Sequence, residues 1–170
     1  MLPRVDEVTR EQVAREFDDR GPRACVAEIS SEMQRNNPEL LDIAVRCARD
    51  SGDPEEIMVG MCMFYQLLLI QGKRSRSDTP LIDSGSVQFS ALPSVRTQSR
   101  DIIVAEIERD GPQIFTLRWL DSLERENPQL LQMAHLFASH HADYLGIMQG
   151  FILLYACLET EARADLSLLH

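Results

Sequence analysis

The sequence predicts an all-α protein: a tandem duplication of a four-helix unit, its copies offset by 90 residues and packed around two apolar central helices. The first observation behind this prediction is a pair of apolar runs, IMVGMCMFYQLLLI at 57–70 and IMQGFILLYACL at 147–158. Each run is longer than an ordinary buried strand and shorter than the roughly 20 residues that cross a bilayer. A helix that is apolar on nearly every side belongs in the middle of a fold.

The second observation is an internal repeat without gaps. Residues 9–70 align with residues 99–160, and 17 of the 62 aligned positions are identical. A period of 90 is far longer than the roughly 20–50 residues of solenoid repeats, so a duplicated unit is favoured over an array. The predicted division is a first four-helix repeat at 1–71, a connection at 72–98 and a second four-helix repeat at 99–170.

Glycine, proline, asparagine and aspartate place the helix ends. Gly21-Pro22 ends one helix and begins the next, because Gly suits a helix C-terminus and Pro suits the first helical position. Asn37-Pro38 and Asp53-Pro54 carry the same kind of start signal, with Asn or Asp as the N-cap. The predicted helices are Val8–Asp19, Pro22–Arg35, Pro38–Arg49 and Pro54–Ile70 in the first copy, and Arg100–Asp110, Pro112–Arg125, Pro128–Ser139 and Asp143–Glu161 in the second.

The connection at 72–98 differs from both copies. It is rich in serine, contains two prolines and has no helical or strand period. This composition predicts either a disordered linker or a strap held on the surface. Leu81-Ile82 and Phe89 to Leu92 are the apolar residues expected to pin such a strap.

Composition narrows the classes of function and the cellular compartment. The 170 residues carry a net charge of −10, which argues against direct nucleic-acid binding and against an anionic membrane surface. Free, buried thiols in a reducing compartment are expected, since the four cysteines have neither CxxC nor zinc-finger spacing. The first residues lack the apolar segment of a signal peptide, so we expect a cytoplasmic protein.

Histidines gathered in the second copy are the candidate metal site. His135, His140, His141 and Asp143 are residue types that bind zinc or act as acid and base. Their intervals of 5, 1 and 2 do not suit a helical metal pair, although a turn between helices would gather them. The alternative is His near a helix C-terminus, favoured by the helix dipole, with Asp143 as an N-cap.

Glycines inside the central helices are candidate helix-contact positions. Gly60, Gly146 and Gly150 stand in predicted helices, where each costs about 1 kcal/mol relative to Ala. Close approach of a second helix offsets such a cost, so we expect the two central helices to meet at these residues.

Some charged and aromatic residues occur in both copies. Arg10, Arg35, Arg100 and Arg125 are expected to be solvated surface charges, with an inter-helix ion pair or a site for docking a partner as the alternatives. Tyr65 and Tyr155 are expected to pack their rings and to bond their hydroxyls within the protein rather than to donate protons in catalysis.

No catalytic or cofactor motif is recognisable. The sequence has no phosphate-binding glycine loop, no GxSxG and no HExxH, so no cofactor is expected. The pattern favours a non-catalytic helical binding or regulatory module that contacts a protein partner or a second copy of itself. The alternatives are a metal-dependent protein or enzyme using the His135–Asp143 region, and an acidic mimic of nucleic acid.

Overall fold

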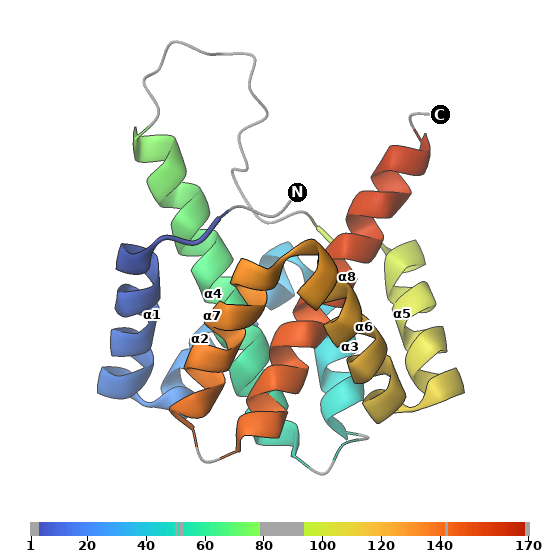
Figure 1. Cartoon of the computed structure of the whole chain (residues 1–170), viewed down its shortest axis with the longest axis horizontal. Coiled ribbons are helices and arrows are strands. Elements are labelled where there is room, and N and C mark those ends of the chain that lie inside the picture. Colours follow the sequence, from blue (N-terminus) through green and yellow to red (C-terminus); the bar gives the residue numbers. More distant parts are fainter. Residues whose placement is uncertain (1–3, 50, 52, 79–93, 142, 169–170) are drawn as a thin grey trace.

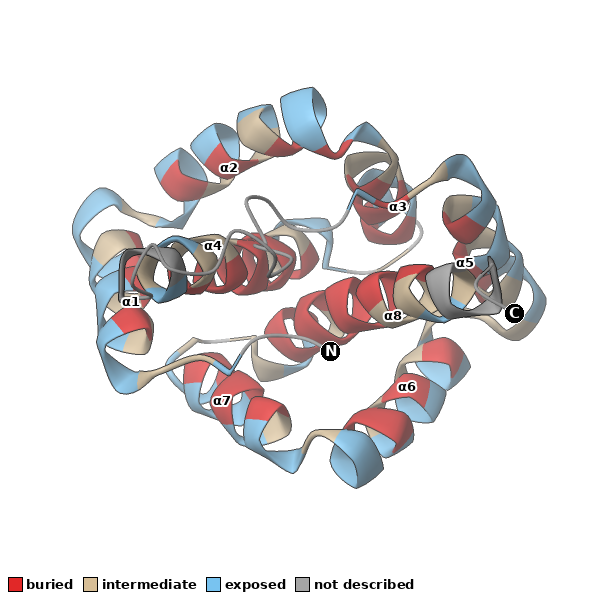
Figure 2. Cartoon of the chain, turned by 90° about the horizontal axis from the view of Figure 1, so that it is seen from above, coloured by how far each residue is buried: buried red, intermediate tan, exposed pale blue. Residues whose placement is uncertain are grey.

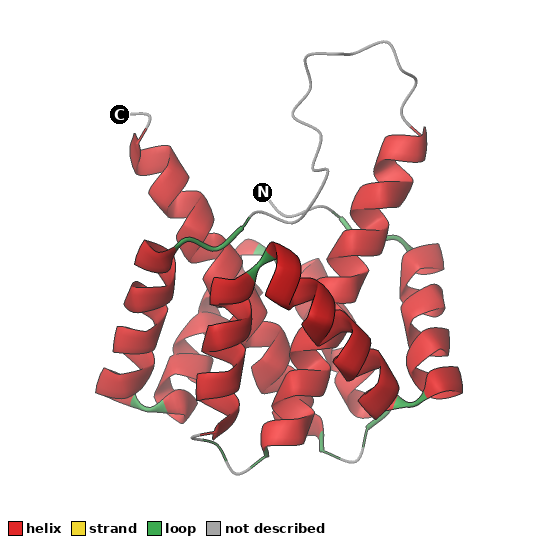
Figure 3. Cartoon of the chain, turned by 180° about the vertical axis from the view of Figure 1, so that it is seen from behind, coloured by secondary structure: helices red, strands yellow, loops and turns green. Residues whose placement is uncertain are grey.

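The computed structural model describes residues 4–49, 51, 53–78, 94–141 and 143–168, and within these ranges it is all-helical, with eight helices and no strand (Figures 1 and 3). The all-α prediction is therefore confirmed. The helices are α1 (Glu7–Arg20), α2 (Pro22–Asn36), α3 (Pro38–Arg49), α4 (Pro54–Asp78), α5 (Thr97–Asp110), α6 (Pro112–Glu126), α7 (Pro128–Ser139) and α8 (Tyr144–Leu168).

The predicted helix boundaries lie where the glycine, proline and asparagine signals place them. Gly21 and Gly111 have φ of 86° and 83°, a left-handed conformation that glycine adopts without strain. Their backbone N–H groups close the preceding helices on the carbonyls of Phe17 and Ile107, at 3.1 and 2.8 Å. Each glycine is followed by a proline at the first position of the next helix.

The fourth helix is longer than the sequence pattern predicts. α4 runs on to Asp78, so residues 72–78 are helical although they lie inside the predicted connection. These residues have no apolar period, but Lys73, Arg74 and Arg76 are good helix formers and extend a helix that is already nucleated. Gln71 also bonds Ser75 one turn later at 3.2 Å. Leu81-Ile82 and Phe89 to Leu92 lie outside the described residues, and the division into domains stays a prediction.

The other end of the connection is attached to the first half. Val95 is buried, and its backbone N–H donates to the side-chain oxygen of Asn37 at 2.8 Å. The Ser94 hydroxyl donates to the Asn36 carbonyl at 3.2 Å. The chain therefore enters α5 from the turn between α2 and α3.

Two central helices form the core. α4 and α8 pack against each other, and the other six helices surround them (Figure 2). α1, α2 and α3 pack on α4, while α5, α6 and α7 pack on α8. Phe64 of α4 stacks on Phe151 of α8 with a centroid distance of 5.2 Å. The ends of α4 and α8 extend beyond the outer helices and diverge (Figure 1).

Length and composition would allow α8 to cross a membrane. The segment Tyr144–Ala164 has 21 residues and sufficient mean hydropathy, and 72% of its most apolar window is buried inside the protein. The apolar run at 147–158 has only 12 residues and is by itself too short to cross a bilayer. The longer segment adds the residues on both sides of that run. Burial on this scale is the pattern of a core helix.

Glycine allows α4 and α8 to approach closely. A Cβ added at Gly60 would lie closer to the Ile147 carbonyl oxygen than van der Waals contact allows, and 2.9 Å from the Ile147 carbonyl carbon. A Cβ at Gly150 would lie 2.5 Å from the Met61 nitrogen. Gly146 faces the Cβ of Glu56, 2.5 Å from such an added atom. These glycines lie where the two helix backbones touch.

The same polar attachment occurs once in each half. Gln71 Oε1 accepts from the Thr9 hydroxyl and from the Asp6 backbone N–H, both at 2.9 Å. Ninety residues later, Glu161 Oε2 accepts from the Ser99 hydroxyl at 2.5 Å and from the Arg96 backbone N–H at 3.2 Å. Each attachment holds the first turn of an outer helix, α1 or α5, to a central helix.

Candidate functional site

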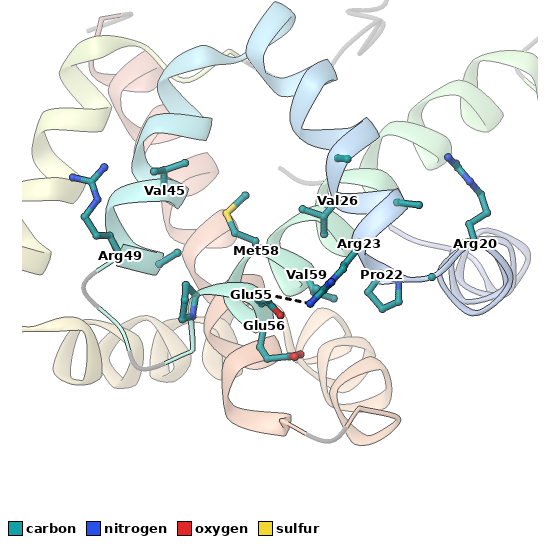
Figure 4. A pocket seen from close by; sticks show the side chains of 15 residues that line it. Arg20, Pro22, Arg23, Val26, Val45, Arg49, Glu55, Glu56, Met58 and Val59 are labelled. Carbon is teal, nitrogen blue, oxygen red and sulfur yellow. Dashed lines mark ion pairs between the residues drawn. The ribbon is translucent and has the colours of Figure 1, made fainter.

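An apolar groove lies between α2, α3 and the first turns of α4. Its volume is about 1060 Å³, and Figure 4 shows side chains from all three helices pointing toward it. Val26 comes from α2, Val45 from α3, and Met58 and Val59 from α4. We call this surface the groove; its lining also includes Ala24, Ala27, Ala48 and Pro54.

Small residues on the outer sides of α2 and α3 leave the groove open. The inward face of α2 is formed by Cys25, Ile29 and Met33, which are buried. Ala24 and Ala27 lie on other sides of the same helix and present only methyl groups to the groove. Val45 is 41% exposed although it is apolar.

Arginines and glutamates form the rim of the groove. Arg20 pairs with Glu28 at 2.5 Å, and that hydrogen bond raises the pKa of Arg20 further above its ordinary value. Arg23 pairs with Glu55 at 3.7 Å (Figure 4). Arg49 has no ion-pair partner among the described residues. The rim therefore offers charged contacts around an apolar floor.

The groove offers binding rather than chemistry. Among its lining residues, only three arginines and two glutamates have ionisable side chains. The lining contains no Ser, Thr, Cys, His or Lys side chain, and one of its two carboxylates, Glu55, pairs with Arg23. The arrangement suits the burial of an apolar surface with charges at its edge.

The candidate metal residues have other contacts in the structure. His135 lies on the exposed side of α7, and its Nδ1 forms a hydrogen bond with the Tyr144 hydroxyl. The two rings also stack, with their centroids 5.7 Å apart. His140 is the C-cap of α7 and is exposed. Asp143 accepts a 3.1 Å bond from the Gly146 N–H, as a helix N-cap does. Among the residues described, no three His, Cys, Asp or Glu side chains are placed to hold a metal ion.

A pair of aspartates meets where the central helices begin. Asp53 precedes α4 and Asp143 precedes α8, and their carboxyl groups contact each other. That contact, with a smaller effect of burial, raises the pKa of Asp53 above its ordinary value of 3.8. The sequence marks both residues as helix caps; their meeting depends on how α4 and α8 cross.

The two repeated tyrosines are core residues. Tyr65 and Tyr155 are each 1% exposed. Burial, and then the neighbouring Glu32, raises the pKa of the Tyr65 phenol. Burial also raises the pKa of Tyr155, with Glu159 and Glu126 as further causes, while a bond to Ser122 opposes it.

The repeated arginines have different surroundings, and none of them lines the groove. Arg100 pairs with Glu39 at 2.5 Å and with Asp42 at 3.7 Å, and so ties α5 to α3. Arg125 pairs with Asp121 within its own helix at 3.2 Å. Arg10 is half-buried on α1, and Arg35 is exposed in the last turn of α2.

The cysteines are buried and free, as the sequence predicts. Burial raises the pKa of the Cys62 thiol to about 12, so the reactive thiolate form is scarce at neutral pH. Burial likewise raises the pKa of Cys157. These thiols therefore act as core residues.

Sequence reasoning missed the groove. The available signal was a second apolar side on α2 and α3, where Ala24, Ala27 and Val45 fall outside the main inward stripe. Small apolar residues at such positions are common on protein surfaces, so the pattern becomes a groove only when α4 lies beneath it. No family model, curated protein or solved structure matches this chain.

Proposed function

We propose that the protein is a non-catalytic, cytoplasmic binding module that receives an amphipathic helix of a protein partner in the groove. The observation that carries the proposal is the groove itself, with an apolar floor, an arginine-rich rim and a volume of about 1060 Å³. A surface helix laid into an apolar groove is a recurring mode of peptide recognition.

The shape and charge of the groove define the partner. The floor, built from Val26, Val45 and Met58, suits apolar side chains spaced three and four residues apart on the partner helix. Arg20, Arg23 and Arg49 favour acidic residues at the flanks of that helix. Buried apolar area supplies the affinity, and the rim sets the orientation.

We also propose that the two halves arose by duplication of one four-helix unit. The bounds of all four helices in the second half equal those of the first plus 90. The glycine turns, the 17 identical positions and the paired attachments at Gln71 and Glu161 support the proposal. After a duplication, the groove and the corresponding surface of the second half are free to diverge in sequence and to take different roles in binding.

A photo-crosslinking amino acid at Val45 tests the binding proposal in cells that express the protein. We expect it to label one protein segment with apolar residues at helical spacing, identified by mass spectrometry of the crosslinked peptide. Glu11, exposed on α1, is the matched control position. Labelling from Val45 that does not exceed labelling from Glu11 would refute the proposal.

A charge placed in the groove gives a second measurement. Ala27→Arg, combined with the crosslinker at Val45, puts an unpaired guanidinium against the apolar floor. We expect the yield of the crosslink to fall about tenfold or more, since a loss of 1.4 kcal/mol already weakens binding tenfold. An unchanged yield would mean that the labelled segment lies elsewhere.

A further inference from the structure

The second half of the molecule exposes large apolar side chains. Ile114 is 56% exposed, Leu117 is 64% exposed and Leu145 is 71% exposed. Single exposed apolar residues are ordinary, but Ile114 and Leu117 are three residues apart on α6 and so lie on the same side of that helix. Large apolar side chains grouped in this way mark a contact surface. We call these three residues the ridge.

The ridge occupies the positions that correspond to the groove. At the offset of 90, Ala24 corresponds to Ile114, Ala27 to Leu117 and Glu55 to Leu145. All three groove residues are replaced by larger or more apolar ones. At these three positions the first half carries two alanines and a glutamate, and the second half carries large, exposed apolar side chains.

Two further groove positions are also filled in the second half. Val45 and Pro54 line the groove, and His135 and Tyr144 stand at the corresponding positions. Their rings stack with an interplanar angle of 13°. Tyr144 directly precedes Leu145, so the stacked rings lie next to this ridge residue.

Each of the two surfaces has an ion pair at its edge, and the order of the charges along the chain is reversed between the halves. Next to the groove, Arg20 pairs with Glu28 at 2.5 Å. At the corresponding positions beside the ridge, Asp110 pairs with Arg118 at 2.7 Å. Arg20 thus corresponds to Asp110 and Glu28 to Arg118, and each edge neutralises its own charges.

We propose that the occupant of the groove is the ridge of a second copy of this chain. The inference rests on the proposed function, because it names the partner of that same groove. The exposed apolar side chains of the ridge and the apolar floor of the groove belong to the same chain, and this supports the second copy as the occupant.

The positions of the two surfaces determine the kind of assembly. α2 and α3 lie on one side of the central pair, and α6 and α7 lie on the opposite side (Figure 2). Groove and ridge are therefore different surfaces on opposite sides, and their contact is heterologous. Such contacts add copies head to tail into rings or open chains instead of stopping at a two-fold dimer.

Sedimentation velocity over a range of protein concentrations tests the inference. We expect the parent protein to form species larger than a dimer as its concentration rises. Higher salt should strengthen the assembly, because a net charge of −10 on each copy opposes it and salt screens that repulsion. A parent protein that stays monomeric up to its solubility limit, at both low and high salt, would overturn the inference.

Two variants give a decisive mixing experiment. Ala27→Arg spoils the groove and Leu117→Arg spoils the ridge, so each variant alone should be monomeric. A 1:1 mixture should form a dimer of twice the monomer mass and nothing larger, because one intact ridge meets one intact groove. If the parent assembles but the mixture stays monomeric, copies associate through other surfaces and the inference is wrong.

Further variants keep the test valid if Ala27→Arg fails to fold. Val45→Arg, at a residue that is already 41% exposed, replaces it in the groove, and Leu145→Arg is a second ridge variant. Leu136→Arg is the matched control: Leu136 is 43% exposed on α7 and corresponds to Arg46, outside the groove lining. The control should assemble like the parent, and its loss of assembly would contradict the ridge assignment.

The crosslink from Val45 separates the two proposals. A crosslink to residues around Leu117 or Leu145 of another copy supports both proposals. A crosslink to a helix of a different protein retains the binding function and overturns the second-copy inference. Absence of any crosslink above the control position overturns both.

Discussion

At the scale of single residues, the buried carboxylate of Glu161 holds the start of α5 on α8 by accepting hydrogen bonds from it. Burial alone would raise its pKa, but hydrogen bonds from Ser99 and from the Arg96 backbone, together with the Arg96 guanidinium, lower it below the ordinary 4.5. Its counterpart Gln71 accepts the same two kinds of hydrogen bond without a charge. Replacing Glu161 by Gln therefore measures how much the negative charge adds to the free energy of unfolding.

Glu161→Gln is expected to lower the free energy of unfolding by about 1 kcal/mol at pH 7, the difference between charged and neutral hydrogen bonds. Because the pKa of Glu161 is lower in the folded protein than the unfolded value of 4.5, its ionised form stabilises the fold above pH 4.5. This stability is lost as the pH falls through the folded pKa. The gap between parent and variant in urea unfolding should therefore close below pH 4.5. Glu159→Gln, which removes the same charge two residues earlier, is the control and should have a smaller effect.

The pair of Asp53 and Asp143 at the start of the central helices has the opposite effect on stability: its ionised form destabilises the fold. Because contact with Asp143 raises the pKa of Asp53, the ionised pair lowers stability at pH values above that raised pKa. This loss of stability becomes smaller as the pH falls through the raised pKa toward 3.8, because Asp53 is then protonated. Asn is as good an N-cap as Asp, so the repulsion can be removed with the cap retained.

Asp53→Asn should accordingly raise the Tm at pH 7, and this gain should shrink steadily as the pH is lowered toward 3.8. Thermal melts followed by circular dichroism across this range measure the effect. Asp18→Asn makes the same change in net charge on the exposed side of α1 and serves as the control. A gain of equal size in both variants would point to net charge instead of the pair.

At the scale of helices, the crossing of α4 and α8 depends on the absence of side chains at two positions. We expect Gly60→Ala and Gly150→Ala each to destabilise the protein by about 1–3 kcal/mol through overpacking, despite the better helix propensity of Ala. The reason is that the added methyl would meet backbone atoms of the other helix, which cannot rotate away. Chemical denaturation measures the change.

Gln132→Ala, on the exposed side of α7, supplies the comparison for these glycine variants. It raises helix propensity without adding a contact, so its stability should stay within about 0.5 kcal/mol of the parent. A glycine variant as stable as the parent would show that the helices can separate at no cost.

Helix boundaries were largely readable from the sequence because they are local events. Pro38–Arg49 and Pro128–Ser139 were predicted with the bounds that α3 and α7 have. The extension of α4 to Asp78 was not predicted, since polar residues such as Arg74 carry no apolar period. Arg74 is instead held by Asp6 at 3.3 Å, a contact between residues 68 apart.

The candidate site was much less predictable than the helices. The groove depends on how Ala27, Val45 and Met58, from three different helices, come together. The contact of Asp53 with Asp143 likewise joins residues 90 apart. The histidines attracted attention in the sequence because of their chemistry, yet the structure pairs His135 with Tyr144 and leaves His140 exposed at a helix end.

At the scale of the whole molecule, the two halves share one core. Each central helix supplies part of the apolar environment of the other, as the stacking of Phe64 on Phe151 illustrates. Because unfolding of either half would expose the apolar face of the other central helix, we expect both halves to unfold in one cooperative transition. The repeat boundary is therefore not expected to divide the chain into two independently stable parts.

Urea unfolding followed by two probes checks this expectation. Fluorescence of Trp119, the only tryptophan, reports on α6 in the second half, while circular dichroism reports on the helices of both halves. The two curves should have the same midpoint. Their separation would mean that one half unfolds before the other, as independent domains do.

The mutual burial of α4 and α8 has a consequence during synthesis. The ribosome makes α8 about 90 residues after α4, an interval on the order of 5–20 s at typical rates of elongation. Throughout that interval the face of α4 around Gly60 and Phe64 has no partner from its own chain. Two nascent chains on one messenger present the same face to each other, so an exchange of central helices between neighbouring chains is the misassembly that this architecture invites.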